Sequence, residues 1–376
     1  MVRDDQGATI RIGSGFASLQ ADSTTEESDP DMGMGMERQS DEQGQAGEEA
    51  FLGALLGMAI GDALGMPAAN GPGLPPGTTI RGYLSLTLDD GTVIEAGEFT
   101  EETEAALSIV EVATTDRGAL DPDLIGPRLV RLEQGDSGHW QDAVSRAALR
   151  RAADTLDFQV AVDEDGPVSS AVATRGIPVG LLASVGALDS GTIREDSETV
   201  ARLTHGSPAQ ANAVAAVAFA VQLAGRGTFP PGEWAQRTAR FLGAGAMHDV
   251  LDRDVSGSDL PAHVRRLAAG GPEEQVAAGI MAAAGTPSFE DAVLLAVNAG
   301  GPADTIGAVA GALAGAYHGV GDIPQWLIDG LGGRIYVSLA SPWFRRAALY
   351  RAGVVRDLPM DGGGLPPPRP LLPPRR

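Results

Sequence analysis

Apolar and polar residues divide the chain into three parts of different character. Residues 1–48 are rich in Asp, Glu, Gly, Ser and Gln, with few apolar residues beyond the Met-Gly-Met-Gly-Met of 32–36. At Glu49 the composition changes, and apolar residues recur at helical spacing to about residue 350. After Arg351 the chain is rich in Pro and Arg. The pattern predicts a helical domain over 49–350 between a disordered acidic tail, 1–48, and a disordered Pro/Arg-rich tail, 351–376.

Two of the predicted helices carry glycine along one face. In each, over 51–67 and over 304–317, glycine recurs at every fourth position. A glycine inside a helix costs roughly 1 kcal/mol relative to alanine, so repeated glycines need a compensating gain. Very close helix packing supplies such a gain, and we expect these two helices to lie against each other in the core. The glycines are Gly53, Gly57, Gly61, Gly65, Gly307, Gly311 and Gly315.

The remaining segments also favour helices. We expect helices after Thr100, over 120–160, at the end of 163–184, and on both sides of a break at His205–Pro208. Helical runs alternate with Gly/Pro breaks over 232–297. Residues 68–97 are irregular and fit either two short strands or a long loop. The predicted fold class is therefore all-α, with one large helical domain.

Composition excludes several kinds of chemistry. The 376 residues include no cysteine and no lysine, which excludes disulfides, thiolate chemistry and lysine Schiff bases. The net charge of -23 argues against nonspecific binding to nucleic acid or to an anionic membrane. The start lacks the features of a secretory signal, and the longest apolar runs, 51–60 and about 211–224, are shorter than the ~20 residues that span a bilayer. A cytoplasmic location is the expectation.

The start of the 304–317 helix carries candidate ligands. Gly300 and Gly301 form a turn, and Pro302 suits the first helical position. Asp304 and Thr305 then fall in the first turn, beside exposed backbone N–H groups. Such a helix end binds an anion through its N–H groups or a metal through its carboxylate. An ordinary capped core helix has the same pattern, so the residues leave these alternatives open.

A second helix start has a similar composition. Thr100 is a plausible N-cap, and Glu101, Glu102 and Glu104 follow it. Together they offer several oxygen ligands to a hard divalent cation. A Thr cap followed by glutamates is also an ordinary helix start.

Other polar residues are candidates for a binding site. Asp62 is the one charge in the apolar helix over 51–67, and it lies either at a helix edge in water or at a site. Ser169, Ser170 and Arg175 suit phosphate or sugar hydroxyls, although Arg175 equally suits a structural ion pair. His205 stands at a predicted helix C-terminus, where histidine is most often a cap.

Together these segments resemble the ADP-ribosylglycohydrolase family, which includes the dinitrogenase-reductase-activating glycohydrolases. GALLGMAIGDALGMP at 53–67 is similar to the family's first helix, and GEFTEET at 97–103 takes the place of its Gly-Glu-Trp-Thr-Asp-Asp-Thr motif. Three further segments resemble family motifs: SSAVATRGIPVGLL at 169–182, LTHGSPA at 203–209 and GGPADTIGAVAGALAGAYHG at 300–319. The five segments occur in the family's order across the helical domain.

The resemblance implies an all-α orthogonal bundle with a binuclear Mg²⁺ or Mn²⁺ site in a central cleft. It also implies hydrolysis of the bond that joins ADP-ribose to a protein side chain or a small acceptor. In that reaction a metal holds the ribose hydroxyls and orients a water, and a carboxylate acts as general base. The expected partner is an ADP-ribosylated protein or small molecule, with no nucleic acid and no membrane, and the oligomeric state is left open.

The resemblance assigns roles to the residues of this chain that stand at the matching positions of the family's motifs. Glu101 and Glu102 are the catalytic candidates. The expected metal ligands are Thr100, Glu101, Glu102, Asp304 and Thr305. The expected substrate-binding residues are Asp62, Ser169, Ser170, Arg175, His205, Gly300 and Gly301.

This chain departs from the family pattern at several positions where the family carries residues of its metal and substrate sites. Glu101-Glu102 replaces the usual Asp-Asp pair, and Pro302 replaces an Asp, which removes a ligand of the second metal ion. Three interpretations follow. The protein is a hydrolase with an altered site that holds one metal ion, or it is a non-catalytic relative that binds ADP-ribose or another nucleotide. The third interpretation is a scaffold whose tails recruit partners. Further departures are Ala69 for Glu, Ser170-Ala171 for Asn-Gly, and Thr174 for Met.

Overall fold

The computed structural model describes residues 44–356, apart from short gaps. The described residues belong to one compact unit, Gln43–Arg376. The predicted disordered tails, 1–48 and 351–376, lie outside the described residues except for 44–48 and 351–356; there Ala46 is buried, and Glu48 and Arg351 belong to helices. The gaps are 70–73, 75–76, 89–90, 136–141, 155–156, 159–161, 163, 188 and 254–258.

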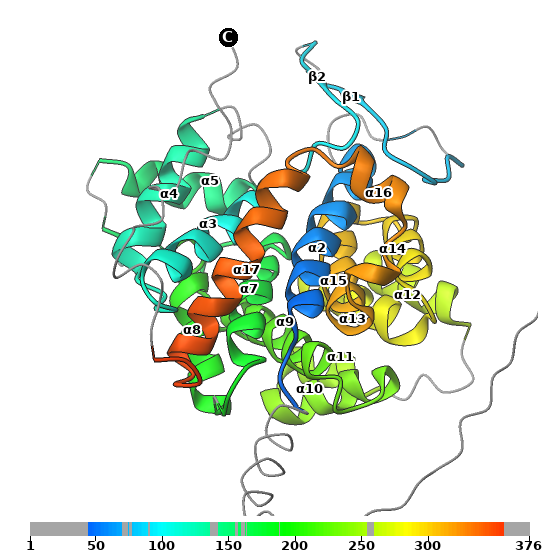
Figure 1. Ribbon diagram of the computed structural model, residues 1–376. Coiled ribbons are helices and arrows are strands. Elements are labelled where there is room, and N and C mark those ends of the chain that lie inside the picture. The colour runs from blue at the N-terminus through cyan, green and yellow to red at the C-terminus, as the bar shows by residue number, and fades with distance from the viewer. Residues whose placement is uncertain are drawn as a thin grey trace, which may run out of the picture. The chain divides into compact units, whose positions relative to one another are not determined.

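Helices form most of the described chain, which confirms the predicted all-α class (Figure 1). The helices of the first half are α2 (Glu48–Ala69), α3 (Glu101–Thr115), α4 (Pro122–Gln134), α5 (Ala143–Ala152), η2 (Ala171–Arg175), α7 (Gly176–Ala183), α8 (Ser190–Ala201) and α9 (Pro208–Arg226). Those of the second half are η3 (Pro231–Glu233), α10 (Trp234–Leu242), α11 (Ala246–Leu251), α12 (Leu260–Ala268), α13 (Pro272–Gly285), α14 (Phe289–Val297), α15 (Ala303–His318), η4 (Val320–Asp322), α16 (Gln325–Gly330) and α17 (Arg334–Arg351).

The irregular segment before α3 contains one small hairpin. Strand β1 (Leu86–Thr87) pairs antiparallel with β2 (Val93–Ile94), with Leu86 opposite Ile94. Leu86 and Ile94 are buried and pack with Met66 near the end of α2. Of the two alternatives for 68–97, the structure therefore contains the short strands.

Helices α2 and α15 lie side by side at the centre of the molecule (Figure 1). Their glycine faces meet, and the contact is backbone against backbone. A Cβ added to Gly57 would lie 2.1 Å from the carbonyl oxygen of Gly311, and one added to Gly61 would lie 1.9 Å from that of Gly307. No side chain fits between these helices, which confirms the predicted packing. We call this contact the glycine seam.

Helix α2 is longer than its apolar run predicts. Its 22 residues make it, among the described residues, the one helix long and apolar enough to cross a membrane, but 94% of that apolar window is buried inside the protein. The aromatic ring of Phe51 on α2 packs edge-on against that of Phe344 on α17, with centroids 5.7 Å apart. Helix α2 is therefore the core helix around which the bundle is packed.

Candidate active site

The starts of α3 and α15 meet beside the glycine seam. The hydroxyl of Thr305 donates a hydrogen bond to Glu102 Oε1 at 2.8 Å, and the hydroxyl of Thr100 donates to Glu102 Oε2. The backbone N–H of Thr305 donates to Asp304 Oδ1 at 2.8 Å. The structure thus brings together the two helix starts that the sequence singles out. All five residues predicted as metal ligands are buried: Thr100, Glu101, Glu102, Asp304 and Thr305.

Asp62 of α2 holds the start of α3 in place. Its Oδ2 accepts hydrogen bonds from the backbone N–H groups of Thr100 and Thr103, at 3.0 and 3.2 Å, and from the Thr103 hydroxyl at 2.6 Å. Its Oδ1 lies 2.8 Å from the Thr100 hydroxyl, whose single proton goes to Glu102 Oε2, so this contact needs a proton on the Asp62 carboxyl. Thr100 occupies the N-cap position as expected, but its side chain does not cap α3. The carboxylate of Asp62 supplies the cap from another helix.

The structure excludes one of the two alternatives for Asp62. The side chain is fully buried, so it does not lie in water at a helix edge. Its hydrogen bonds run to Thr100 and Thr103, so the structure gives it the place of a residue that positions α3. A direct contact with substrate, as the sequence predicts, would require Asp62 to give up part of this cap.

Burial and the repulsion between neighbouring carboxylates raise the free energy of the ionised forms in this cluster. Burial, and then the charge of Glu102, raise the pKa of Asp62 to about 7. Burial and the charge of Asp304 raise the pKa of Glu102, although hydrogen bonds from Thr100 and Thr305 oppose the shift. Burial, followed by Glu102 and Asp142, raises the pKa of Glu101 well above its usual value. The cluster therefore favours bound protons or a bound cation.

Arg175 is buried in a second polar group, next to this cluster. Its Nη1 donates to the carbonyl of Val200 at 3.1 Å and to the hydroxyl of Thr204 at 2.7 Å, and its Nη2 lies 3.4 Å from the hydroxyl of Ser145. Burial lowers its pKa to about 10, so the guanidinium stays charged at neutral pH. These bonds go to neutral oxygens, so Arg175 links α5 to the end of α8.

Asp142, which the sequence reasoning missed, joins the two polar groups. Its backbone N–H donates to Glu101 Oε1, and its side chain caps α5 by accepting from the N–H of Val144 at 2.9 Å and of Ser145 at 3.2 Å. An Asp before an Ala-rich helical run is a recognisable N-cap. That signal would have predicted the helix start but not the contact with Glu101.

His205 faces Asp142, and its ring contacts the side chains of Thr204 and Asp142. Its Nδ1 lies 2.8 Å from the hydroxyl of Thr204, and its Nε2 lies 3.9 Å from Asp142 Oδ1. Because the Thr204 hydroxyl accepts from Arg175, it can donate to Nδ1, which places the ring proton on Nε2. Burial lowers the pKa of His205, so the ring is neutral at pH 7.

The other predicted substrate residues lie in different surroundings. Ser170 is buried at the start of η2, which packs on both α3 and α15. The backbone N–H of Ser169 donates to the side chain of Gln210 at 3.0 Å. A Cβ on Gly300 would meet open space, whereas one on Gly301 would collide with the carbonyl of Ala268. Gly300 therefore borders free space, and Gly301 serves the packing of α12.

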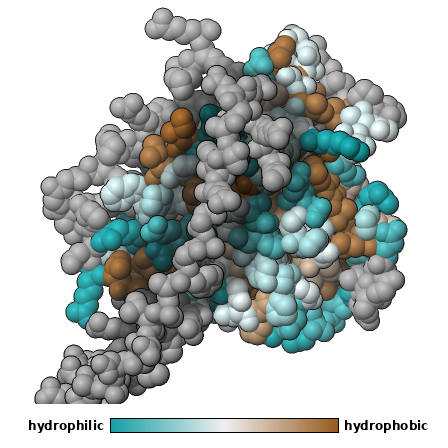
Figure 2. Space-filling view, turned by 45° about the vertical axis from the view of Figure 1, so that its right-hand side comes forward, coloured by the Kyte–Doolittle hydropathy of each residue, from teal (hydrophilic) through white to brown (hydrophobic). Residues whose placement is uncertain are grey.

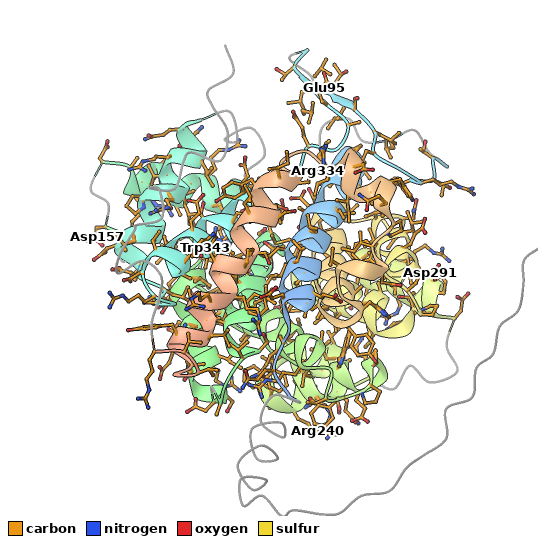
Figure 3. All side chains as sticks on the ribbon, in the orientation of Figure 1. Glu95, Asp157, Arg240, Asp291, Arg334 and Trp343 are labelled. Atoms are coloured by element: carbon orange, nitrogen blue, oxygen red, sulfur yellow. The ribbon has the colours of Figure 1, made fainter. Side chains whose placement is uncertain are left out.

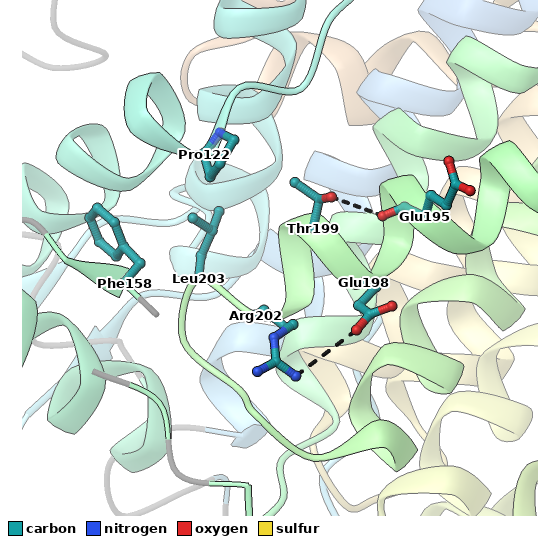
Figure 4. A pocket seen from close by; sticks show the side chains of 7 residues that line it. All are labelled: Pro122, Phe158, Glu195, Glu198, Thr199, Arg202 and Leu203. Atoms are coloured by element: carbon teal, nitrogen blue, oxygen red, sulfur yellow. Dashed lines mark hydrogen bonds and ion pairs between the residues drawn. The ribbon is translucent and has the colours of Figure 1, made fainter. Parts of the chain in front are cut away.

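A cavity of about 410 Å³ opens beside Leu203, which directly precedes Thr204 (Figure 4). In it the Thr199 hydroxyl donates to the carbonyl of Glu195 at 2.9 Å, and Arg202 lies 3.9 Å from Glu198. The walls contain none of the residues predicted for the site, so this cavity is separate from the carboxylate cluster. The lining residues are Pro122, Phe158, Glu195, Glu198, Thr199, Arg202 and Leu203.

The model of the ADP-ribosylglycohydrolase family matches residues 43–356. The chain belongs to this family. A solved structure described as an ADP-ribosylglycohydrolase-related protein complex superposes with a TM-score of 0.63 at 30% identity, covering 81% of this chain and 98% of that one. The predicted family and its helical bundle are confirmed, and membership supports a hydrolase of ADP-ribose linkages.

Curated relatives share about a quarter of their residues with this chain. The uncharacterized protein YegU of Escherichia coli (strain K12) is 27% identical over 311 residues, which is 73% of this chain and 89% of that protein. An uncharacterized protein of Archaeoglobus fulgidus is 28% identical over 309 residues, 77% of this chain and 94% of that protein. The ADP-ribosylarginine hydrolase Tri1 of Serratia proteamaculans is 25% identical over 311 residues, 74% of each.

Proposed function

We propose that this family member hydrolyses the bond between ADP-ribose and an acceptor with the help of one divalent cation, Mg²⁺ or Mn²⁺. The observation that carries the proposal is the meeting of two helix starts that bury Glu101, Glu102 and Asp304 together with two threonine hydroxyls. Buried carboxylates that raise one another's pKa are stabilised by a cation.

The donor set fits a hard cation by its chemistry. It consists of carboxylate and hydroxyl oxygens, the ligands that Mg²⁺ and Mn²⁺ prefer. Glu101 Oε2 is buried and has no hydrogen-bond partner among the described residues. In the same part of the chain, no three Asp, Glu or His side chains already converge as a finished metal site. Thr100 and Thr305 instead bond to Glu102, and these are the contacts that a cation would compete for.

The proposed ligands are Thr100, Glu101, Glu102, Asp304 and Thr305. When bound, the cation would supply positive charge for the substrate's hydroxyl groups and for an attacking water. Pro302 offers no side-chain oxygen, so a second ion would lack a ligand. We expect Pro302→Asp to add a second cation to the binding stoichiometry measured by calorimetry. An unchanged stoichiometry would remove Pro302 as the reason for a one-metal site.

The two adjacent glutamates are suited to different roles. Both carboxylate oxygens of Glu102 accept from threonine hydroxyls, so this side chain is held in one position. Glu101 is held at Oε1 by the Asp142 N–H and keeps Oε2 unbonded. Glu101 is therefore the better placed of the two to take a proton from water, and its raised pKa increases its affinity for that proton.

We propose arginine as the acceptor of ADP-ribose. Asp142 Oδ2 is a buried carboxylate oxygen without a hydrogen-bond partner among the described residues, and a guanidinium donates N–H groups to carboxylates. The relative Tri1 is described as an ADP-ribosylarginine hydrolase, which supports the same choice. A serine linkage has no side-chain N–H group to donate to Asp142 Oδ2.

The experiment is a calorimetric titration of Mg²⁺ and Mn²⁺ into metal-free protein, followed by hydrolysis assays on ADP-ribosylated arginine and serine. We expect saturable binding that Asp304→Ala abolishes and Asp329→Ala, an exposed carboxylate on α16, leaves unchanged. Equal metal affinity in the wild type and the Asp304→Ala variant would refute the site. Binding of ADP-ribose without turnover would identify the non-catalytic relative, which the replacement of a ligand by Pro302 favours as the second candidate.

A further inference from the structure

Two cavities lie beside α8, separate from the carboxylate cluster. The larger cavity, of about 410 Å³, is the one in Figure 4, and a smaller cavity of about 240 Å³ shares Glu198 and Arg202 with it. The smaller cavity adds Arg194 of α8 and Asn212 of α9. Hydrophobic and hydrophilic side chains are intermixed on the face of the molecule that Figure 2 shows, and such a surface selects no particular ligand. The two cavities are more selective, because each combines charged groups with an apolar wall.

The charged groups in the two cavities differ in net sign. The smaller cavity contains Arg194 and Arg202 against Glu198, which is an excess of positive charge. The larger cavity contains Glu195 and Glu198 against Arg202, which is an excess of negative charge. A ligand that fits both cavities therefore has an anionic group at one end and hydrogen-bond donors at the other.

Arg194 is held in place by two aromatic rings. Its Nη2 donates to the carbonyl of Phe241, and its guanidinium lies 4.5 Å from the centre of the ring of that residue. The ring of Phe241 stacks on that of Phe219, with centroids 4.2 Å apart. A guanidinium has five N–H donors, and the carbonyl of Phe241 uses one of them. Arg194 is therefore positioned in advance and retains donors for an anion.

The ion pairs of Arg202 are easily replaced. Its Nη2 lies 3.2 Å from Glu164 Oε1, and its Nη1 lies 3.9 Å from Glu198 Oε1. The side chains of these glutamates are 70% and 62% exposed, and ion pairs at such positions contribute only about 0–1 kcal/mol. A phosphate group binds a guanidinium through two oxygens at once, so it competes well with both glutamates.

The larger cavity suits a nucleoside. Its apolar wall is formed by Phe158, Leu203 and Pro122, and an aromatic ring in such a wall stacks on the face of a nucleobase. The carboxylates of Glu195 and Glu198 are acceptors for ribose hydroxyls, which an acidic side chain binds in other nucleotide sites. The donors that this cavity calls for are therefore present on a ribose and on the amino group of a base.

Size favours a ligand with two linked parts. Small-molecule pockets measure about 300–1,000 Å³, a range that includes the larger cavity but not the smaller one. An inorganic phosphate would leave the larger cavity unused, and a nucleoside would leave the two arginines of the smaller cavity without an anion. A nucleoside phosphate uses both.

We propose that a nucleoside phosphate binds beside α8, with its phosphate between Arg194 and Arg202 and its base against Phe158. This site is distinct from the candidate active site, and its occupation does not depend on hydrolysis.

The two sites share one short segment of the chain. Arg202 lines both cavities, and Thr204, two residues later, accepts from Arg175. The backbone N–H of His205 donates to the carbonyl of Ala201 at 2.9 Å, which closes the turn. A nucleotide that orders Arg202 therefore acts on the segment that carries Thr204 and His205, which is the position of an effector.

The experiment is a calorimetric titration of AMP, adenosine and inorganic phosphate into the full chain. We expect AMP to bind at least about tenfold more tightly than either part alone. The double variant Arg194→Ala/Arg202→Ala should lose at least about tenfold in affinity for AMP. The control, Arg131→Ala/Arg265→Ala, removes two exposed arginines from α4 and α12 and should bind AMP as the wild type does.

Two further measurements keep the test independent of folding and of the candidate active site. Arg202→Ala alone removes only exposed ion pairs, so it should remain folded in a thermal melt and still bind AMP more weakly. Hydrogen–deuterium exchange with AMP should slow along α8 and at the start of α9.

Three outcomes would overturn the proposal. Equal AMP affinity in the double variant and its control would remove the arginines from the site. Protection confined to the starts of α3 and α15 would place AMP in the carboxylate cluster alone. Inorganic phosphate that binds as tightly as AMP would show that the larger cavity takes no part.

Discussion

The glycine seam and the carboxylate cluster are built on the same two helices, but they are held together by opposite means. In the seam, Gly57 and Gly311 bring backbone against backbone, and no titratable group takes part. In the cluster, one residue beyond Gly61, buried carboxylates and hydroxyls fill the space. Shape alone determines the seam, whereas charge and protonation determine the cluster. Steric changes and changes in pH should therefore act on separate parts of one helix pair.

The largest effect is expected from side chains added to the seam. Gly57→Ala places a Cβ 2.1 Å from the carbonyl oxygen of Gly311, which the backbone can relieve only by separating the helices. We expect a loss of more than about 3 kcal/mol in the free energy of unfolding, and failure to fold for Gly57→Leu or Gly311→Leu. The control is Gly232→Ala, where the added Cβ meets open space. Thermal melts that match between Gly57→Ala and this control would refute the seam.

The next effect is on catalysis. Glu101→Gln removes the proposed base and keeps the size of the side chain, so hydrolysis of ADP-ribosylated arginine should fall by about 10²- to 10⁴-fold while the melting curve stays cooperative. Glu95→Gln, at an exposed position before α3, should retain full activity (Figure 3). If Glu101→Gln retains wild-type turnover, the base lies elsewhere in the cluster.

A smaller effect is expected from pH in metal-free protein. Because the pKa of Asp62 is raised to about 7 in the folded state, the folded protein binds more protons than the unfolded chain between about pH 4 and pH 7. Its contribution to stability is therefore present below pH 4 and is lost as pH rises through 7. The lowered pKa of His205 acts in the opposite direction, so the wild type alone does not isolate Asp62.

The variant Asp62→Asn separates these contributions. It should remove the part of the pH dependence of the unfolding free energy between pH 4 and pH 7 that Asp62 contributes. Denaturant titrations at several pH values measure this slope, with Asp329→Asn on α16 as the exposed control. An identical slope in wild type and Asp62→Asn would mean that Asp62 is ionised throughout this range.

The smallest effect concerns one hydrogen bond between the helix starts. Thr305→Val keeps the shape of the side chain but removes the hydroxyl that bonds to Glu102. We expect a loss of about 1 kcal/mol in the free energy of unfolding. Thr199→Val removes a hydroxyl that bonds only within its own helix, and it should change stability less. The reverse order would show that Thr305 does not hold the two starts together.

The residues differ in how far sequence alone could place them. The seam was predictable because glycine at every fourth position marks one helix face, and two such faces fit each other. The positions of the polar starts of α3 and α15 were predictable because their motifs occur in the family's order, and their role as metal ligands stays a prediction. The role of Asp62 was not, because its hydrogen bonds join it to residues about 40 positions away with no periodic signal. Asp142 was missed because it contacts Glu101 through its backbone N–H. Every residue except proline carries this group, so the sequence gives no signal for the contact.

The seam also has a consequence for how the protein is made. Its two halves are about 250 positions apart in the chain, so at roughly 5–20 residues per second a ribosome needs about 12–50 s to add α15 after α2. During that time α2, a helix apolar enough to pass for a membrane span, has no partner for its glycine face. We therefore expect chaperone occupancy on ribosome-bound chains to fall once α15 has emerged.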